Sequence, residues 1–180
     1  MRIAITGPQG SGKTTLMNAL QSALKELQVD LDILPEITRT VEELGFPINE
    51  SGADETQLMI TATHIQNALA RDNYIVDRCL LDGYVYSEYL FNEGKVSGYV
   101  ADFAYEILKR YFSKYDLVFY IPNEFELEDD GCRSVAEDFR KKISDLFEGT
   151  LAKLKLAKQT SNVYKLTGSV SDRCAAAVGY

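Results

Sequence analysis

Short apolar runs alternate along the chain with longer segments in which apolar residues recur every three or four positions. The short runs predict five strands, at about 2–6, 29–34, 74–76, 117–121 and 163–166. The longer segments predict helices between them, and strands that alternate with helices are typical of a parallel α/β sheet. We therefore expect a five-stranded parallel sheet flanked by helices.

The first helix is expected to open at about Lys13 and to carry an apolar stripe that runs on to Leu27. A loop rich in turn-forming residues follows the second strand at 45–54. Further helices are expected over the segment with Leu58, Ala62, Ile65 and Leu69, at about 80–91 and 99–111, from about 135 to 151, and from about 171 onward. Gly149 is a candidate for a bend or a break in the long helix.

Length and composition favour a single domain over residues 1–180. No apolar stretch approaches the length of a membrane span, and a first strand at residue 2 leaves no room for a targeting peptide. The expected location is therefore the cytoplasm, with no membrane partner. Cys79, Cys132 and Cys174 are far apart and odd in number, which favours reduced thiols. Because His64 is the single histidine, the sequence argues against a zinc site or a histidine-based triad.

The formal net charge of −8 argues against a protein that wraps long stretches of nucleic acid, because such binding depends on neutralising many phosphates. A small anionic ligand needs only a local cluster of donors. A nucleotide ligand is therefore compatible with this charge.

Residues 7–14 read Gly-Pro-Gln-Gly-Ser-Gly-Lys-Thr, a complete G-x-x-x-x-G-K-[ST] phosphate loop between the first predicted strand and helix. Its glycines allow the backbone to wrap a polyphosphate with successive N–H groups pointing inward. Lys13 can reach the β- and γ-phosphates of ATP, and the Thr14 hydroxyl can ligate Mg²⁺. The expected nucleotide-binding residues are Gly7, Pro8, Gln9, Gly10, Ser11, Gly12, Lys13, Thr14 and Thr15.

Charged residues follow three other predicted strands. The second strand is followed by Pro35-Glu36 and the third by Asp77-Arg78, and the segment after the fourth holds Arg133. In open parallel sheets the ligand binds beyond the carboxyl ends of the strands. We therefore expect two carboxylates and two guanidiniums to surround one cleft together with the phosphate loop.

This set of residues differs from that of a hydrolytic motor or switch. Hydrolytic ATPases of this kind usually carry two adjacent acids at the end of an apolar strand. Here Asp77 is followed by an arginine, and the 117–121 strand ends without an acid. The sequence also contains no N-K-x-D motif of the kind that GTPases use for base recognition. A small-molecule phosphotransferase fits better, with one carboxylate as base, one near the metal, and arginines on the acceptor and the migrating phosphoryl group.

The phosphate loop, Pro35-Glu36 and Asp77-Arg78, in this order and rough spacing, resemble the P-loop nucleoside and nucleotide kinases. The chain is similar to deoxynucleoside kinases, thymidylate kinases, the nicotinamide-riboside kinase domain of a bacterial bifunctional enzyme, and small phage AAA-type kinase-like ATPases. The stretch 115–133 and the Leu-Thr-Gly-Ser sequence at 166–169, followed by Arg173, resemble the last group most. The resemblance implies a three-layer P-loop NTPase fold with strand order 2-3-1-4-5, and kinases of this kind are often homodimers.

The resemblance also implies roles for individual residues. Glu36 matches the acid that takes the proton from the acceptor hydroxyl in deoxynucleoside kinases, and Asp77 matches the acid placed near Mg²⁺ or the acceptor. Arg78 matches the arginine that holds the acceptor or the transferred phosphate, and Arg133 would be a lid arginine. Arg39, about one helical turn beyond Glu36, is a candidate to hold an acceptor phosphate.

Each of these residues also has a purely structural interpretation. A helix dipole would favour Glu36 at a helix N-terminus, and Asp77 and Arg78 could form a structural ion pair. Arg133 could pair with the acidic run that precedes it. That run is either a solvated loop or part of a mobile lid at about 123–140.

The expected function is transfer of the γ-phosphoryl group of ATP to a nucleoside or a nucleoside monophosphate, with Glu36 or Asp77 accepting the proton. Two alternatives stay open. One is a kinase that acts on a hydroxymethylated base in DNA, which the net charge disfavours although a flipped base needs only a local groove. The other is a nucleotide-dependent switch or ATPase that signals to a partner and has no small-molecule acceptor.

Overall fold

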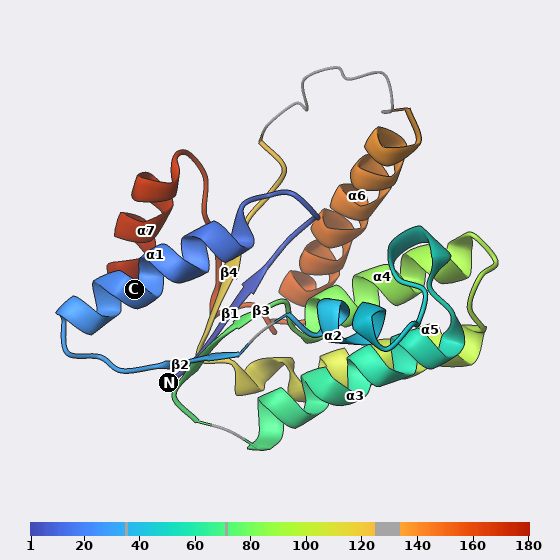
Figure 1. Ribbon diagram of the computed structural model, residues 1–180, viewed down its shortest axis with the longest axis horizontal. Coiled ribbons are helices and arrows are strands. Elements are labelled where there is room, and N and C mark those ends of the chain that lie inside the picture. The colour runs from blue at the N-terminus through green and yellow to red at the C-terminus, as the bar shows by residue number, and fades with distance from the viewer. Residues whose placement is uncertain (35, 71, 125–133) are drawn as a thin grey trace.

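The computed structural model describes residues 1–34, 36–70, 72–124 and 134–180. A parallel sheet in the strand order β2-β3-β1-β4-β5 forms its centre and confirms the expected architecture (Figure 1). The strands are β1 (Arg2–Thr6), β2 (Asp32–Leu34), β3 (Tyr74–Asp77), β4 (Leu117–Tyr120) and β5 (Val163–Lys165).

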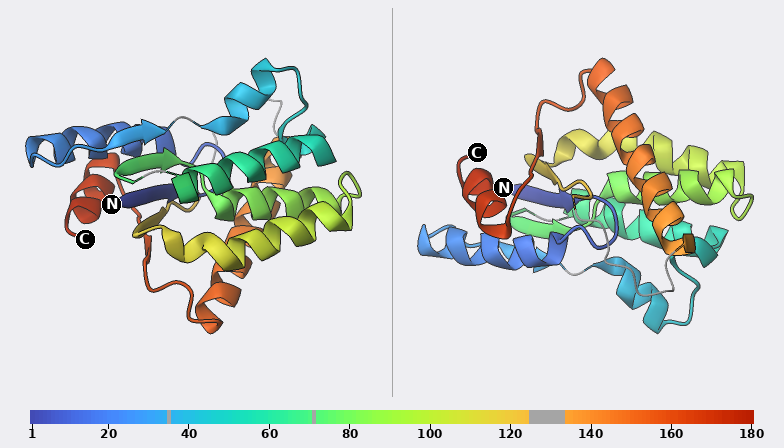
Figure 2. Two further views of the ribbon diagram at one scale, coloured as in Figure 1. Left: turned by 90° about the horizontal axis from the view of Figure 1, so that it is seen from below. Right: turned by 90° about the horizontal axis from the view of Figure 1, so that it is seen from above.

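Helices cover both faces of the sheet (Figures 1 and 2). On one face α1 (Lys13–Glu26) packs against α7 (Val170–Val178). The opposite face is covered by α3 (Asp54–Ala70), α4 (Leu80–Asn92), α5 (Gly98–Tyr111) and α6 (Ser134–Leu156). The short elements α2 (Ile37–Glu43), η1 (Asn49–Ser51) and η2 (Phe112–Lys114) lie in the connections.

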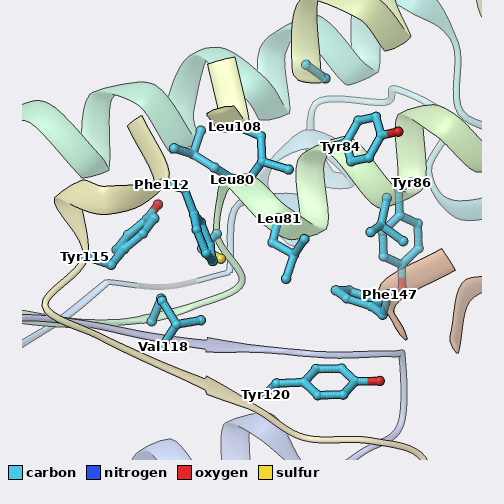
Figure 3. Packing of buried hydrophobic residues seen from close by; sticks show 14 of the residues in the cluster. Leu80, Leu81, Tyr84, Tyr86, Leu108, Phe112, Tyr115, Val118, Tyr120 and Phe147 are labelled. Atoms are coloured by element: carbon cyan, nitrogen blue, oxygen red, sulfur yellow. The ribbon is translucent and has the colours of Figure 1, made fainter. Parts of the chain in front are cut away.

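Successive side chains of a strand point to opposite faces of the sheet. The apolar core is therefore divided into two clusters, one on each face. Phe119 of β4 packs in the cluster beneath α1 and α7, whereas its neighbours Val118 and Tyr120 belong to the cluster on the other face. Figure 3 shows this second cluster, in which Phe147 of α6 lies between Tyr120 and Leu81. The centroids of the Tyr120 and Phe147 rings are 5.8 Å apart. Both faces of the sheet are therefore covered by apolar side chains.

The second strand is shorter than its apolar pattern predicts. Val29 does not belong to β2, because its N–H donates to the carbonyl oxygen of Leu24 and closes the end of α1. Gln28 before it has a φ of +61°, which turns the chain. Pairing with β3 begins only at Asp32, opposite Tyr74.

Two helices also differ from the expectation. The periodic pattern did not predict the α2 helix, because its seven residues bury only Val41, although one interpretation of Glu36 placed it at a helix N-terminus, where it lies. The α6 helix continues through Gly149 without a break, because helical glycine is unfavourable by only about 1 kcal/mol relative to alanine. None of the helices in the described ranges is long and apolar enough to cross a bilayer.

Candidate active site

The loop between β1 and α1 adopts a conformation that depends on glycine. Gly10 and Gly12 have φ values of +73° and +88°, in the left-handed region that other residues rarely enter. Gly12 directly precedes α1, and no side chain in the described part of the chain caps this 14-residue helix. The first N–H groups of the helix therefore point into the loop, where they can bind an anion.

The loop leaves β1 through Gly7, whose φ is +142°. A Cβ atom on this residue would lie 2.2 Å from the carbonyl oxygen of Ile121. We expect Gly7→Ala to lower the free energy of unfolding in urea by about 3 kcal/mol, because it combines backbone strain with a clash against backbone. Gly94→Ala is the matched control, since Gly94 has a φ of +68° and nothing within 4 Å of such a Cβ, so that only about 1 kcal/mol is lost. Equal losses in the two variants would contradict this account of Gly7.

Lys13 is the first residue of α1, and its side chain is buried within the loop. Its Nζ donates to the carbonyl oxygens of Gly7 at 2.8 Å and Pro8 at 2.7 Å. Burial lowers the pKa of Lys13 to about 8, with a further contribution from the nearby charge of Arg78. The ammonium group is thus held by neutral carbonyl groups, and a polyphosphate would supply the negative charge that favours its protonated form.

Thr14 and Asp77 form the candidate metal position. The Thr14 hydroxyl donates to Oδ2 of Asp77 at 2.5 Å. The other carboxylate oxygen of Asp77, Oδ1, is buried without a hydrogen-bond partner among the described residues, and burial raises the pKa of the Asp77 carboxyl above its usual value. An orphaned carboxylate oxygen beside a hydroxyl is a donor set that suits Mg²⁺, which prefers oxygen ligands together with phosphate and water. Within the described ranges no cluster of three or more acidic, histidine or cysteine side chains could hold a metal by itself.

Glu36 and Arg78 form an ion pair at the carboxyl ends of β2 and β3. The Arg78 Nε donates to Oε1 of Glu36, which also accepts a hydrogen bond of 2.7 Å from the Thr38 hydroxyl. Burial opposes ionisation of Glu36, but the charge of Arg78 and these two hydrogen bonds outweigh it and lower the pKa of the Glu36 carboxyl. The ion pair therefore keeps Glu36 ionised at neutral pH.

Arg78 is held from its other side by Asp82 and Tyr86 of α4. Its Nη1 lies 3.5 Å from Oδ1 of Asp82 and 3.3 Å from the Tyr86 hydroxyl, and its guanidinium lies over the Tyr86 ring. Although burial opposes the charged form, Tyr86, Asp82 and Glu36 together raise the pKa of Arg78. The φ of Arg78 is +71°, which is costly for a residue with a side chain. Strained backbone of this kind persists only where the surrounding contacts fix it, and here these contacts aim the guanidinium at Glu36.

A cleft of about 580 Å³ opens along these groups. Most of the predicted site residues line it: Gln9, Gly10, Gly12, Lys13, Thr14, Thr15, Glu36, Arg39, Asp77 and Arg78. Gly7, Pro8 and Ser11 do not line it but shape the loop behind it, since their backbone carbonyls accept hydrogen bonds from Lys13 and Arg173. The Arg39 side chain is 74% exposed and lies 3.8 Å from Oε2 of Glu36, at the mouth of the cleft.

Arg140 of α6 reaches the phosphate loop from the sheet face opposite to α1. Its Nη2 lies 3.6 Å from the position of a Cβ on Gly10 and donates to Oδ1 of Asn123 at 3.1 Å. Its Nε is buried and has no hydrogen-bond partner in the ranges described. Arg140 was not predicted from the sequence, because one arginine within a long helical pattern resembles a solvated residue. Arg133, the arginine that was predicted, lies outside the described residues, as does the 125–133 part of the expected lid.

Two further residues were missed as parts of the site. Asp82 is 2% exposed and accepts hydrogen bonds from the Thr6 hydroxyl and the Cys79 N–H. Its position four residues after Arg78, on a predicted helix, is the signal that could have identified it. Arg173 of α7, also buried, donates to the carbonyl oxygen of Ser11 and to Glu124, each at 2.8 Å. It thereby links α7, the phosphate loop and the segment after β4.

Comparison with known proteins identifies the family of the chain. The family model described as "AAA domain" matches residues 2–173. No curated protein matches the sequence.

Solved structures with the same fold cover nearly the whole chain. NadR in complex with NR has a TM-score of 0.69 at 15% identity, covering 98% of this chain and 48% of that one. The chain therefore spans about half the length of NadR. Thymidylate kinase from Ehrlichia chaffeensis has a TM-score of 0.66 at 18% identity, with 99% of this chain and 97% of that one covered. Deoxyadenosine kinase from M. mycoides, with dCMP and dCDP bound, has a TM-score of 0.63 at 15% identity and the same coverage.

Proposed function

Because the chain belongs to the AAA domain family and has the fold of nucleoside and nucleotide kinases, we propose that it is an ATP-dependent kinase of a small nucleoside-type acceptor. The observation that carries the proposal is the convergence of Lys13, Glu36 and Asp77 on one cleft. A phosphate-binding lysine, a base and a metal-binding acid are the groups that phosphoryl transfer requires.

The carboxylates of Asp77 and Glu36 have different surroundings, and we assign them different roles for this reason. Asp77 bonds to Thr14 and would hold Mg²⁺ together with it, and the bound ion would neutralise charge on the β- and γ-phosphates. Glu36 faces the cleft as an ionised carboxylate and would take the proton of the acceptor hydroxyl. The hydroxyl oxygen then bonds to the γ-phosphorus while the bond from this phosphorus to the bridging oxygen breaks, and ADP leaves.

Two cations would stabilise the charge that moves in this step. Lys13 would exchange its carbonyl partners for the β- and γ-phosphates. Arg140 lies beside Gly10 of the loop and would approach the same phosphates from α6.

The charges in the cleft favour an acceptor without a phosphate group. An acceptor phosphate needs cations that are not already neutralised, but Arg78 is paired with both Glu36 and Asp82. Of the other described cations that line the cleft, Lys13 would serve ATP, and the exposed Arg39 itself lies 3.8 Å from Oε2 of Glu36, while Glu42 adds a negative charge nearby. We therefore favour a nucleoside over a nucleoside monophosphate. The kinase would work in the cytoplasm, where ATP and nucleosides are available.

A coupled assay of ADP release tests the proposal. The full chain is supplied with ATP, Mg²⁺ and, in turn, natural nucleosides and their 5′-monophosphates, and products are identified by mass spectrometry. We expect ADP release to rise with at least one nucleoside, with formation of its 5′-phosphate. Release that no acceptor stimulates would contradict a kinase, and release with monophosphates alone would contradict the choice of acceptor.

A further inference from the structure

His64 of α3 has a buried polar side chain. It is 1% exposed, and neither of its ring nitrogens has a hydrogen-bond partner in the described part of the chain. The hydroxyl of Thr61, one turn earlier on the same helix, is also buried and has no hydrogen-bond partner among the residues that the structure describes. Buried polar atoms are nearly always hydrogen-bonded in folded proteins. Unpartnered atoms on one face of α3 therefore point to a ligand or to water.

The fold makes room for this imidazole. Gly83 of α4 faces it, and a Cβ on Gly83 would lie 3.2 Å from Cδ2 of His64. Any larger residue at position 83 would press on the ring. Glycine at this position thus leaves space for the ring between the two helices.

His64 lines a small inner pocket that adjoins the main cleft. The inner pocket lies between α3 and α4 and is also lined by Gln57, Ile60 and Tyr86. Arg78 and Thr38, which contact Glu36, line both this pocket and the cleft. A molecule bound beside Glu36 can therefore extend along this shared wall toward His64.

We infer that the inner pocket is an acceptor subsite in which His64 recognises the hydrogen-bonding edge of the nucleoside base. The inference rests on the proposed kinase function and concerns the acceptor end of the same site. The pocket volume of about 20 Å³ accommodates little more than one water, so the sugar and most of the ring lie in the main cleft. Only the polar edge of the base reaches the imidazole and replaces that water.

The chemistry of a neutral imidazole suits such an edge. Burial lowers the pKa of His64 to about 4, against the opposing effect of Asp82, so the ring carries no charge at neutral pH. A neutral imidazole offers one donor and one acceptor. Gln57, whose side-chain oxygen accepts a hydrogen bond from Ser87 at 3.2 Å, provides an amide on the same wall. Neighbouring donors and acceptors are what the Watson–Crick edge of a nucleobase presents.

The test is His64→Leu, which removes both ring nitrogens and keeps apolar bulk. Binding of thymidine, deoxycytidine, deoxyadenosine and deoxyguanosine is measured by calorimetry in the full chain, without ATP. We expect the best of the four to bind His64→Leu about tenfold or more weakly than the wild type, because a polar edge is then left unpaired. The affinity for ATP should be unchanged. Gln66→Leu, an exposed glutamine on the same helix, is the matched control and should leave both affinities unchanged.

Thermal unfolding separates recognition from a structural role. Replacing an unpartnered buried polar group by an apolar one is neutral or stabilising. The ligand-free His64→Leu variant should therefore unfold at the same temperature as the wild type or higher. A lower unfolding temperature, with nucleoside affinity retained, would show that the histidine serves the fold and would overturn the inference.

The remaining outcomes distinguish this inference from the proposed function. Nucleoside binding that is equal in the wild type and His64→Leu overturns the inference, and so does failure of all four nucleosides to bind. If another acceptor is then phosphorylated, the kinase proposal survives alone. Nucleoside binding that depends on His64 without phosphoryl transfer supports the subsite and contradicts the kinase.

Discussion

Replacing Lys13 with alanine should reduce phosphoryl transfer by about 10³-fold, the effect expected for loss of a preorganised charge at the transferred phosphate. Lys13 is 6% exposed and lies at the floor of the phosphate loop, so no solvent cation replaces it at the same place. The measurement is the rate of ADP formation at saturating ATP and acceptor. Retention of more than a tenth of the activity would contradict the assigned role.

Two further variants test whether a folding defect explains the loss of activity. Lys13→Met keeps the buried aliphatic chain and removes only the charge, so it should fold as the wild type does and lose as much activity as Lys13→Ala. Lys25→Ala removes an exposed lysine from the same helix and should retain full activity. If Lys13→Met were active while Lys13→Ala were not, packing rather than charge would explain the loss.

The pKa of Lys13 gives an independent readout of contact with the phosphates. With a pKa of about 8 the ligand-free side chain is mostly neutral at pH 9. A triphosphate favours the charged form, so ATP binding at pH 9 should take up a proton, which calorimetry in buffers of different ionisation enthalpy detects. Proton uptake should disappear in Lys13→Met. Equal uptake in both proteins would mean that the phosphates bind elsewhere.

Strand positions, most helices and the phosphate loop could be predicted from the sequence, because each has a strong local signal. The run Ile3 to Ile5 is apolar on both sheet faces, as a buried parallel strand requires. The end of α1 could not be predicted in the same way. Val29 is apolar and fits a strand, but its N–H is taken by the carbonyl group of Leu24, and that contact depends on the left-handed turn at Gln28.

Residues of the candidate site that follow strand ends could be predicted from the sequence. Residues that lie in the interiors of helices could not. The topology brings Glu36 and Asp77 together, because β2 and β3 are neighbours in the sheet. Arg140 and His64 come from the interiors of helices, where one polar residue in a periodic pattern does not reveal its direction. The partners of such residues depend on how the helices pack, and packing carries no signal in the local sequence.

Substituting Glu36 with glutamine should slow the chemical step by about 10²- to 10⁴-fold, the range for loss of a general base. The affinity for ATP should change by less than about threefold, because glutamine keeps the shape of the side chain and Arg78 remains paired with Asp82. Single-turnover kinetics with ATP and the acceptor measure the step directly. Glu42→Gln removes a charge from the same cleft and should retain nearly full activity, which controls for a general change in electrostatics.

The pH dependence and the metal requirement show which carboxylate is the base. Arg78 holds the pKa of Glu36 below its usual value, so the wild-type rate should stay level as the pH falls and decline only below the ordinary glutamate pKa. The ion pair of Glu36 with Arg78 stabilises the folded state at pH values above the ordinary glutamate pKa. This stabilisation is lost as the pH falls through the lowered pKa of Glu36. Asp77→Asn should instead raise the Mg²⁺ concentration needed for half-maximal activity, whereas Glu36→Gln should leave it unchanged. The opposite pattern would assign the base to Asp77 and the ion pair of Glu36 with Arg78 to structure.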